Sequence, residues 1–256
     1  MKKYLLLLII LSIFNSCEKP SDCVESTGAI VLKDISVQPF SKIKVYRDIA
    51  VEITQGADYK VQIQAGENFI DNVQMQQKDD QLIFNDEASC NWVRAYGTIK
   101  VLITTPTLTE IYSKTNRDID SNGVLTFPDL TILSLDKDAD HESGAGTGDF
   151  HIEVNNTSLT IGNNNVSRFY LSGQTQTANF NFYFGDGRIE AQDLIAQNIK
   201  IFHRGSNDMI VHPIQSLTGA DYNGGGLFST GNLISLTYPP VHDPLPVHYT
   251  GQVIYQ

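Results

Sequence analysis

The acidic stretch LDKDADHESG, residues 135–144, holds the densest group of side chains that could do chemistry. Asp136, Asp138, Asp140 and Glu142 alternate along it, so they would share one face of a strand and could converge in a loop. Oxygen ligands at this density suit Ca²⁺. An EF-hand loop is not matched, because His141 stands at the sixth position, where that loop has Gly. We therefore expect a solvated acidic edge and no metal site, with a calcium site at these four acids as the alternative.

Other catalytic patterns are absent from the sequence. None of the six histidines belongs to a His-x-x-x-His or His-Glu-x-x-His arrangement, and no Gly-x-Ser-x-Gly elbow occurs. A polysaccharide lyase would need a basic proton acceptor, but Arg168, Arg188 and Arg204 recur at unequal offsets and are better explained as surface charges. We therefore expect no cofactor and no catalytic residues.

Cys17 ends the only strongly apolar run of the chain. Lys2 and Lys3 precede about ten mostly apolar residues, too few for the roughly 20 that cross a bilayer and typical of a cleaved export signal. Residues 14–17, FNSC, resemble a bacterial lipobox, and the polar residues after them are compatible with surface lipoproteins of the Bacteroidetes type. We expect a lipid on Cys17 that anchors the chain, since acyl chains contribute about 0.8 kcal/mol per buried CH₂. An ordinary signal peptide with a chance cysteine is the alternative.

Two cysteines, Cys23 and Cys90, remain after Cys17. Export places them in an oxidising compartment, where two leftover cysteines most simply pair. We expect a Cys23–Cys90 disulfide, with two free thiols as the alternative. A metal site is less favoured because no close pair of ligands accompanies them.

The charge of the chain argues against nucleic acid as a partner. The formal net charge is −11, and removal of a signal that contains two lysines and no acids makes it −13. Such a chain is repelled by nucleic acid and by anionic lipid.

The elements that would position these residues are strands almost throughout. Alternation of apolar and polar residues predicts strands within residues 41–55, 58–66, 79–86 and 97–106, with turns at residues 55–58 and 78–80. The one expected helical turn is ENFIDNVQ, residues 67–74, with Asn68 as its cap.

From about residue 108 the pattern becomes a degenerate repeat of about 20 residues. Each repeat has an apolar start, a polar or Gly-containing turn and a second apolar patch. The starts are Leu108, Leu130, Leu159, Phe180, Ile199 and Leu217, and the second patches begin at Ile119, Phe150, Phe169, Ile189, Met209 and Leu227. Repeats of this length predict an all-β fold of the β-solenoid type, resembling a right-handed parallel β-helix, in which stacked rungs share one core. A β-sandwich is the alternative.

Residues 39–84 resemble the opening of a known family. Val51-Glu-Ile53-Thr-Gln55-Gly56, Ala65-Gly-Glu67-Asn68-Phe69 and Asp80-Gln-Leu82-Ile-Phe84 are similar to elements of the bacterial head-GIN (DUF2807) domain, described as a putative autotransporter adhesin head domain. Gly146-Thr-Gly148-Asp149-Phe150 and Gly185-Asp-Gly187-Arg-Ile189 are similar to its later turns. The resemblance covers about residues 28–235 and implies adhesion or envelope binding.

These observations predict a signal peptide at residues 1–16, a tether at 17–27 and one head-GIN-like domain at 28–256. Within the domain we expect a β-rich section at 28–107, repeat rungs at 108–235 and a Pro-rich cap at 236–256. The expected function is that of an outer-membrane lipoprotein, facing the surface or the periplasm, that acts as a non-enzymatic binding or adhesin-like module. The alternatives are a polysaccharide-active enzyme on a β-helix and a periplasm-facing structural lipoprotein.

The expected partners are the membrane, through the lipid, and a glycan or protein ligand. Exposed aromatic side chains could stack on such a ligand, although most of them are expected to fill the core or its edges. The candidates are Trp92, Tyr96, Tyr112, Tyr170, Tyr183, Tyr222, Tyr238 and Tyr249.

Overall fold

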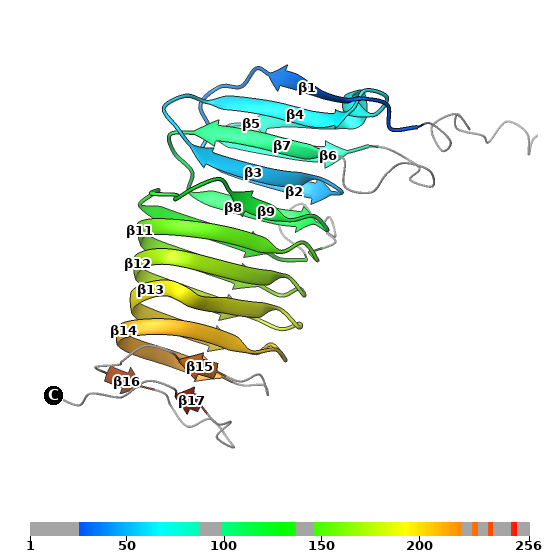
Figure 1. Ribbon diagram of the computed structural model, residues 1–256. Coiled ribbons are helices and arrows are strands. Elements are labelled where there is room, and N and C mark those ends of the chain that lie inside the picture. The colour runs from blue at the N-terminus through cyan, green and yellow to red at the C-terminus, as the bar shows by residue number, and fades with distance from the viewer. Residues whose placement is uncertain are drawn as a thin grey trace, which may run out of the picture.

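The computed structural model is an elongated stack of strands (Figure 1). It describes residues 26–87, 99–136, 146–221, 227–229, 235–237 and 247–249. The predicted all-β class is confirmed. All of the strands belong to one mixed sheet that is strongly curled into a half-barrel.

The sheet curls so that its strands line two faces of the stack. The first face contains β2 (Lys42–Arg47), β6 (Gln81–Asp86), β8 (Glu110–Thr115) and β10 (Asp129–Ser134). The second face contains β3 (Ala50–Gln55), β7 (Lys100–Thr105) and β9 (Ile119–Ser121). Two turn segments, residues 48–49 and 116–118, join the faces.

Four long strands continue both faces. They are β11 (Phe150–Asn163), β12 (Arg168–Phe182), β13 (Arg188–His203) and β14 (Met209–Asp221). The first half of β11 pairs with β9 and its second half with β10, so each long strand lies on the second face and then bends onto the first. The short strands β15 (Leu227–Ser229), β16 (Ser235–Thr237) and β17 (Val247–Tyr249) follow.

The pairing explains why the solenoid prediction is met only in part. From β8 to β14 neighbouring strands are parallel, at steps close to the predicted repeat. Residues 28–107, which we call the N-terminal section, instead contain antiparallel pairs between β1 (Ile30–Ile35), β4 (Lys60–Gly66) and β7, and between β5 (Val73–Lys78) and β6. A parallel β-helix therefore does not describe the whole domain, since these hairpin-like pairs make the sheet mixed. Residues 108–235 are called the rung stack below.

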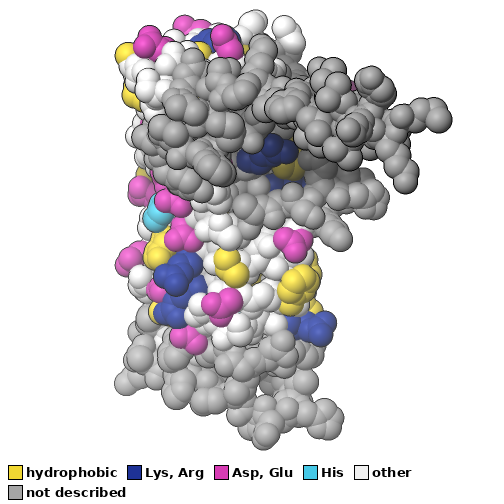
Figure 2. All heavy atoms as spheres, turned by 90° about the vertical axis from the view of Figure 1, so that its right-hand side faces the viewer, with side chains coloured by type: hydrophobic (Ala, Val, Ile, Leu, Met, Phe, Trp, Pro, Cys, Tyr) yellow, Lys and Arg dark blue, Asp and Glu magenta, His cyan; other side chains and the backbone are white. Residues whose placement is uncertain are grey.

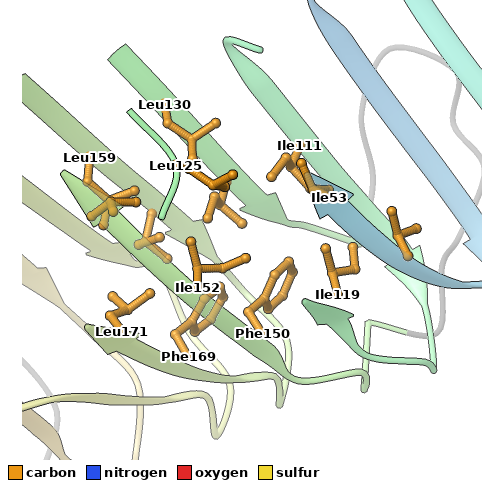
Figure 3. Close-up of a cluster of buried hydrophobic side chains, with 14 of the residues drawn as sticks. Ile53, Ile111, Ile119, Leu125, Leu130, Phe150, Ile152, Leu159, Phe169 and Leu171 are labelled. Atoms are coloured by element: carbon orange, nitrogen blue, oxygen red, sulfur yellow. The ribbon is translucent and has the colours of Figure 1, made fainter. Parts of the chain in front are cut away.

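One hydrophobic core fills the space between the two faces. Alternate residues point inward, and in the second face they pair in register from strand to strand, as Val51, Ile119, Phe150, Phe169, Ile189, Met209 and Leu227. Figure 3 shows how side chains from both faces meet in this core. Full burial of one such side chain stabilises the fold by about 1.5–3 kcal/mol.

The expected helical turn is a 3₁₀ helix over Ile70–Asn72, and the prediction that Asn68 caps it is wrong. The Asn68 Nδ2 atom instead donates to the Ser26 carbonyl at 2.8 Å. Within the described residues, no helix is long and apolar enough to span a membrane.

Candidate functional site

A hollow of about 280 Å³ opens on the outer side of the second face. Its lining comes from β9, β11, β12 and β13, so it runs across four successive strands of the rung stack. Ile152 and Leu171 form its floor with their backbones, and their side chains point into the core. The residues between these buried positions point outward because side chains alternate along a strand.

A column of outward side chains forms one wall of the hollow. Asp120, His151, Tyr170 and Glu190 pair in register on β9, β11, β12 and β13. The His151 and Tyr170 rings stack with centroids 4.9 Å apart and planes 5° apart. The His151 Nδ1 atom lies 2.9 Å from Asp120 Oδ1, so a protonated Nδ1 donates to that carboxylate. The two rings lie face to face, and Asp120 holds the His151 end of this stacked pair.

The lower end of the wall is fixed by an arginine on β13. Arg188 donates to Glu190 Oε1 at 2.5 Å and to Asp208 Oδ2 at 2.8 Å. The hydrogen bond to Glu190, and then the one to Asp208, raise the pKa of the Arg188 guanidinium above its usual value. The Glu190 carboxylate is therefore held by a permanent positive charge.

A bulge in β13 shapes the other side of the hollow. Tyr170 pairs with Glu190, but Ser172 pairs with Asp193, so β13 has one more residue than β12 at this point. A bulge of this kind redirects the side chains beside it. Gln192 and Asp193 therefore both contribute to the lining, where Asp193 lies in one row with Ser172 of β12 and Glu153 of β11. The hollow is thus bordered by aromatic rings on one side and by acidic and amide groups on the other.

Figure 2 shows this mixture of side chains on one flank of the rung stack, where a histidine lies among acidic groups and hydrophobic and basic side chains follow below it. In the described parts of the chain, no three His, Cys, Asp or Glu residues are arranged to hold a metal ion.

The predicted calcium cluster cannot be assembled from the described residues. Of its four acids only Asp136 is described, and its backbone N–H donates to Asn164 Oδ1 at 2.8 Å. Asp138, Asp140 and Glu142 lie outside the described residues, as do Cys17, Cys23 and Cys90. The lipid and the disulfide stay predictions, and the calcium alternative stays untested.

The aromatic candidates divide between the core and the surface. Tyr112 is buried, whereas Tyr170 and Tyr183 are 36% and 46% exposed. Only Tyr170 of these lies in the hollow. The side chains of Trp92, Tyr96, Tyr222, Tyr238 and Tyr249 are not described.

Most of the hollow is not identified by the sequence patterns. Tyr170 is among the aromatic candidates, but no motif assigns His151, Glu153, Glu190 or Asp193 to a site. A signal was present in the repeated patches Phe-His-Ile, residues 150–152, and Phe-Tyr-Leu, residues 169–171. In each patch one outward residue stands between two inward ones, at the same place in the repeat.

Comparison with known proteins agrees with this architecture. The family model described as "Putative auto-transporter adhesin, head GIN domain" matches residues 39–232. A solved structure of a putative adhesin from Bacteroides fragilis has a TM-score of 0.70 and 23% identity, over 89% of this chain and 98% of that one.

Two further solved structures share the fold. A putative adhesin from Parabacteroides merdae has a TM-score of 0.53 and 17% identity, over 90% of this chain and 98% of its own. A putative lipid binding protein from Parabacteroides distasonis has a TM-score of 0.55 and 13% identity, over 89% of this chain and 97% of its own. No curated protein matches the chain.

Proposed function

Because the chain belongs to the head GIN domain family of putative auto-transporter adhesins, we propose that it is a non-enzymatic binding module of the cell envelope. The observation that carries this proposal is the hollow on the second face, where a stacked aromatic pair faces acidic and amide groups. Sites built on strands hold their side chains more firmly than sites on loops. The rung stack therefore offers a preformed surface for a ligand.

The charges at the hollow support binding more than catalysis. The carboxylates at the two ends of the wall each have a partner, since Asp120 contacts His151 and Glu190 contacts Arg188. A general acid or base must reach the reacting atom of its substrate within hydrogen-bond distance. Groups that are held by partners in this way are better suited to fix the shape of a surface.

We infer that a lipid on Cys17 holds the module at the outer membrane. The apolar run before Cys17 and the residues FNSC support this. Eleven residues, 17–27, would then link the membrane to the start of the domain at residue 28. A tether of this length leaves the rung stack within reach of ligands at the envelope.

We also propose that residues 108–235 wind as a right-handed solenoid. The parallel registers of β10 to β14 and the bend of each long strand from one face to the other support it. Such winding would repeat similar outward positions along the stack, as the aligned column of the hollow illustrates.

The function is tested on cells that carry the full chain, with Cys17→Ala and a deletion as controls. Cells are washed over surfaces coated with polysaccharides or with proteins, and protease shaving reports how much of the chain is outside. We expect more cells with the wild-type chain than deletion cells to be retained on at least one coating. The coating polymer should keep its length, since a non-enzymatic module does not cleave it. Equal retention of wild-type and deletion cells, with the chain shown to be outside, would refute the proposal, and shortening of the polymer would favour an enzyme.

A further inference from the structure

We propose that two copies of the chain associate through the free edges of their β1 strands, as an antiparallel pair about a two-fold axis. This surface is separate from the hollow and adds a partner, a second copy of the chain, to the proposed function.

The strand β1 ends the second face, and Figure 1 shows it as the outermost strand at the N-terminal end of the stack. Among the described strands it pairs only with β4, and no bulge interrupts their register. The Ala29 carbonyl accepts from the Glu67 N–H at 2.9 Å. Successive residues of an antiparallel strand direct their backbone groups alternately to its two sides. The N–H and C=O groups of Ile30, Leu32 and Asp34 therefore point to the free edge.

The side chains at this edge are apolar, although exposed edge strands are usually protected by charges, proline or bulges. Ile30 and Leu32 point to the same side and are 52% and 57% exposed, and Leu32 is the most exposed large hydrophobic side chain that the structure describes. The strand that ends the first face, β5, instead has Gln74, Gln76 and Lys78 as its exposed residues. Of the two end strands, only β1 has the apolar surface that a further strand would cover.

The charged residues of β1 do not oppose such a pairing. Lys33 Nζ lies 2.7 Å from Asp71 Oδ1, and Asp34 Oδ1 accepts from Gln62 Nε2 at 2.7 Å. Both charged side chains are thus held by partners in their own chain, which they can keep when another strand joins the edge.

The apolar residues of β1 are complementary to those of a second β1. If the two-fold axis passes through Val31, Ile30 of one copy lies opposite Leu32 of the other, and the backbone groups of both face the shared edge. The four exposed apolar side chains then form one cluster, and such cross-strand pairs stabilise a sheet. An axis through Leu32 would set Ile30 against Asp34, and an axis through Lys33 would set two lysines against each other. The sequence of β1 therefore favours the first register.

A second copy is also the partner that the predicted anchor would bring to this edge. A lipid on Cys17 would hold every copy with its β1 at a similar distance from the same membrane. Confinement of this kind raises the effective concentration of one partner around the other. Contacts between copies of one chain most often have two-fold symmetry, in which the same patch is used twice.

The association should be weak in solution, because two strands of six residues form a small interface. Interfaces that bury less than about 1,200 Å² are typical of transient contacts. The test is sedimentation velocity of the full chain in detergent, with micelles in excess, from about 1 μM to about 300 μM, the range of weak association. We expect monomers at the lowest concentration and dimers at the highest. A chain that stays monomeric throughout would overturn the proposal.

Leu32→Pro tests the edge without removing a hydrogen bond to β4. The Leu32 N–H points away from β4, and proline is tolerated where the N–H of an edge strand faces solvent. Each copy loses one donor to the other, so the dissociation constant of the dimer should rise at least about tenfold. A dimer that persists unchanged in Leu32→Pro would overturn the proposed edge.

A second variant keeps every backbone N–H. Ile30→Lys with Leu32→Lys sets lysines opposite one another across the axis and should also weaken the dimer at least about tenfold, because like charges directly opposite are unfavourable. Ile195→Lys is the matched control, since Ile195 is 43% exposed on β13, away from the edge. Equal weakening by Ile195→Lys, at unchanged thermal stability, would contradict the site.

Hydrogen exchange followed by NMR identifies the partner of the edge. The amides of Ile30 and Leu32 should exchange more slowly at high than at low protein concentration, whereas the Val31 amide, which faces β4, should be protected at both. Protection of Ile30 and Leu32 at every concentration would show that another part of the same chain pairs with β1, and would overturn the proposal. A monomeric chain that still retains cells on a coating would leave the proposed function intact.

Discussion

The N-terminal section and the rung stack share one core but use different means to hold their strands together. In the N-terminal section the strands have six or seven residues, and antiparallel pairs close the end of the sheet. In the rung stack the long strands have 13–16 residues and pair in parallel with the next strand along the chain. The core column from Val51 to Leu227 passes through both regions without a break.

The polar contacts of the two regions differ as well. The N-terminal section has ion pairs between strands or turns, such as Lys33 with Asp71 at 2.7 Å. The rung stack also has ion pairs, at Arg188, but its turns are joined in addition by carboxylates that accept from backbone N–H groups of the next turn. Asp118 Oδ1 accepts from the Asp149 N–H at 3.0 Å, and Asp149 Oδ1 accepts from the Arg168 N–H at 2.9 Å. In the repeating stack the same kind of hydrogen bond thus recurs from one turn to the next.

The largest effect is expected from a cavity in the core of the rung stack. Phe169 is fully buried, and its ring stacks on Phe150 with centroids 4.6 Å apart. Phe169→Ala should destabilise the protein by about 3–5 kcal/mol, measured by denaturant unfolding. In a stack where each rung contacts only its neighbours, hydrogen exchange should accelerate mainly in β11 to β13. Equal acceleration in β2 to β7 would show that the two regions open as one unit.

The next effect concerns the bend at which a long strand passes from one face to the other. Gly173 has φ +94°, and an added Cβ would lie 2.0 Å from the Val154 carbonyl oxygen. A left-handed backbone costs other residues about 1–2 kcal/mol, and the contact with a fixed backbone atom adds to this. We expect Gly173→Ala to destabilise the protein by more than about 2 kcal/mol in thermal unfolding.

Gly123 provides the control for this prediction. Its φ is +88°, but no atom lies within 4 Å of an added Cβ. Gly123→Ala should therefore cost only the backbone strain of about 1–2 kcal/mol. Equal losses of stability from Gly173→Ala and Gly123→Ala would show that the backbone conformation alone, and not the close approach of the neighbouring strand, requires glycine at the bend.

A smaller effect compares the two kinds of polar contact. Asp149→Ala removes the acceptor for the Arg168 N–H and should cost about 1 kcal/mol, the usual value for one hydrogen bond. Lys33→Ala removes an ion pair whose side chains are 47% and 86% exposed, and such pairs contribute about 0–1 kcal/mol. Chemical denaturation of both variants tests the order. A larger loss from Lys33→Ala would reverse the comparison between the regions.

The rung stack was more predictable from the sequence than the N-terminal section. The repeats of the rung stack indicate which residues of neighbouring strands pair. The second patches at Phe150, Phe169, Ile189 and Met209 pair with one another as the repeat requires. The predicted repeat start at Phe180 is two residues too late, because Ala178 is the residue that pairs with the starts Leu159 and Ile199. Alanine is small and gives a weak apolar signal. In the N-terminal section, the alternation of apolar and polar residues located the strands. It could not show whether neighbouring strands run parallel or antiparallel, because the alternation is the same in both cases.

The hollow was only partly predictable for a similar reason. His151 and Tyr170 stand at equivalent positions of two repeats, so their stacking follows from the repeat itself. Asp193 does not, because the bulge in β13 moves it by one residue relative to Ser172. A one-residue insertion is invisible in a degenerate repeat, yet it decides which side chains reach the rim.

The smallest effect is expected at the turn between β5 and β6, where a charged group holds the N-terminal section. The Ser41 hydroxyl donates to Asp80 Oδ2 at 2.7 Å. This hydrogen bond lowers the pKa of the Asp80 carboxyl below its usual 3.8; desolvation opposes the shift, and Lys42 adds to the lowering. A lowered pKa in the folded state stabilises the fold above pH 3.8, and this contribution is lost as the pH falls through the folded-state pKa.

Ser41→Ala should therefore return the pKa of Asp80 toward 3.8, in a carboxyl NMR titration. Thr109→Ala is the control, since the Thr109 hydroxyl donates to the Ser41 carbonyl and not to Asp80. If the Asp80 pKa stays low in Ser41→Ala, then Lys42 and not the hydroxyl holds this turn.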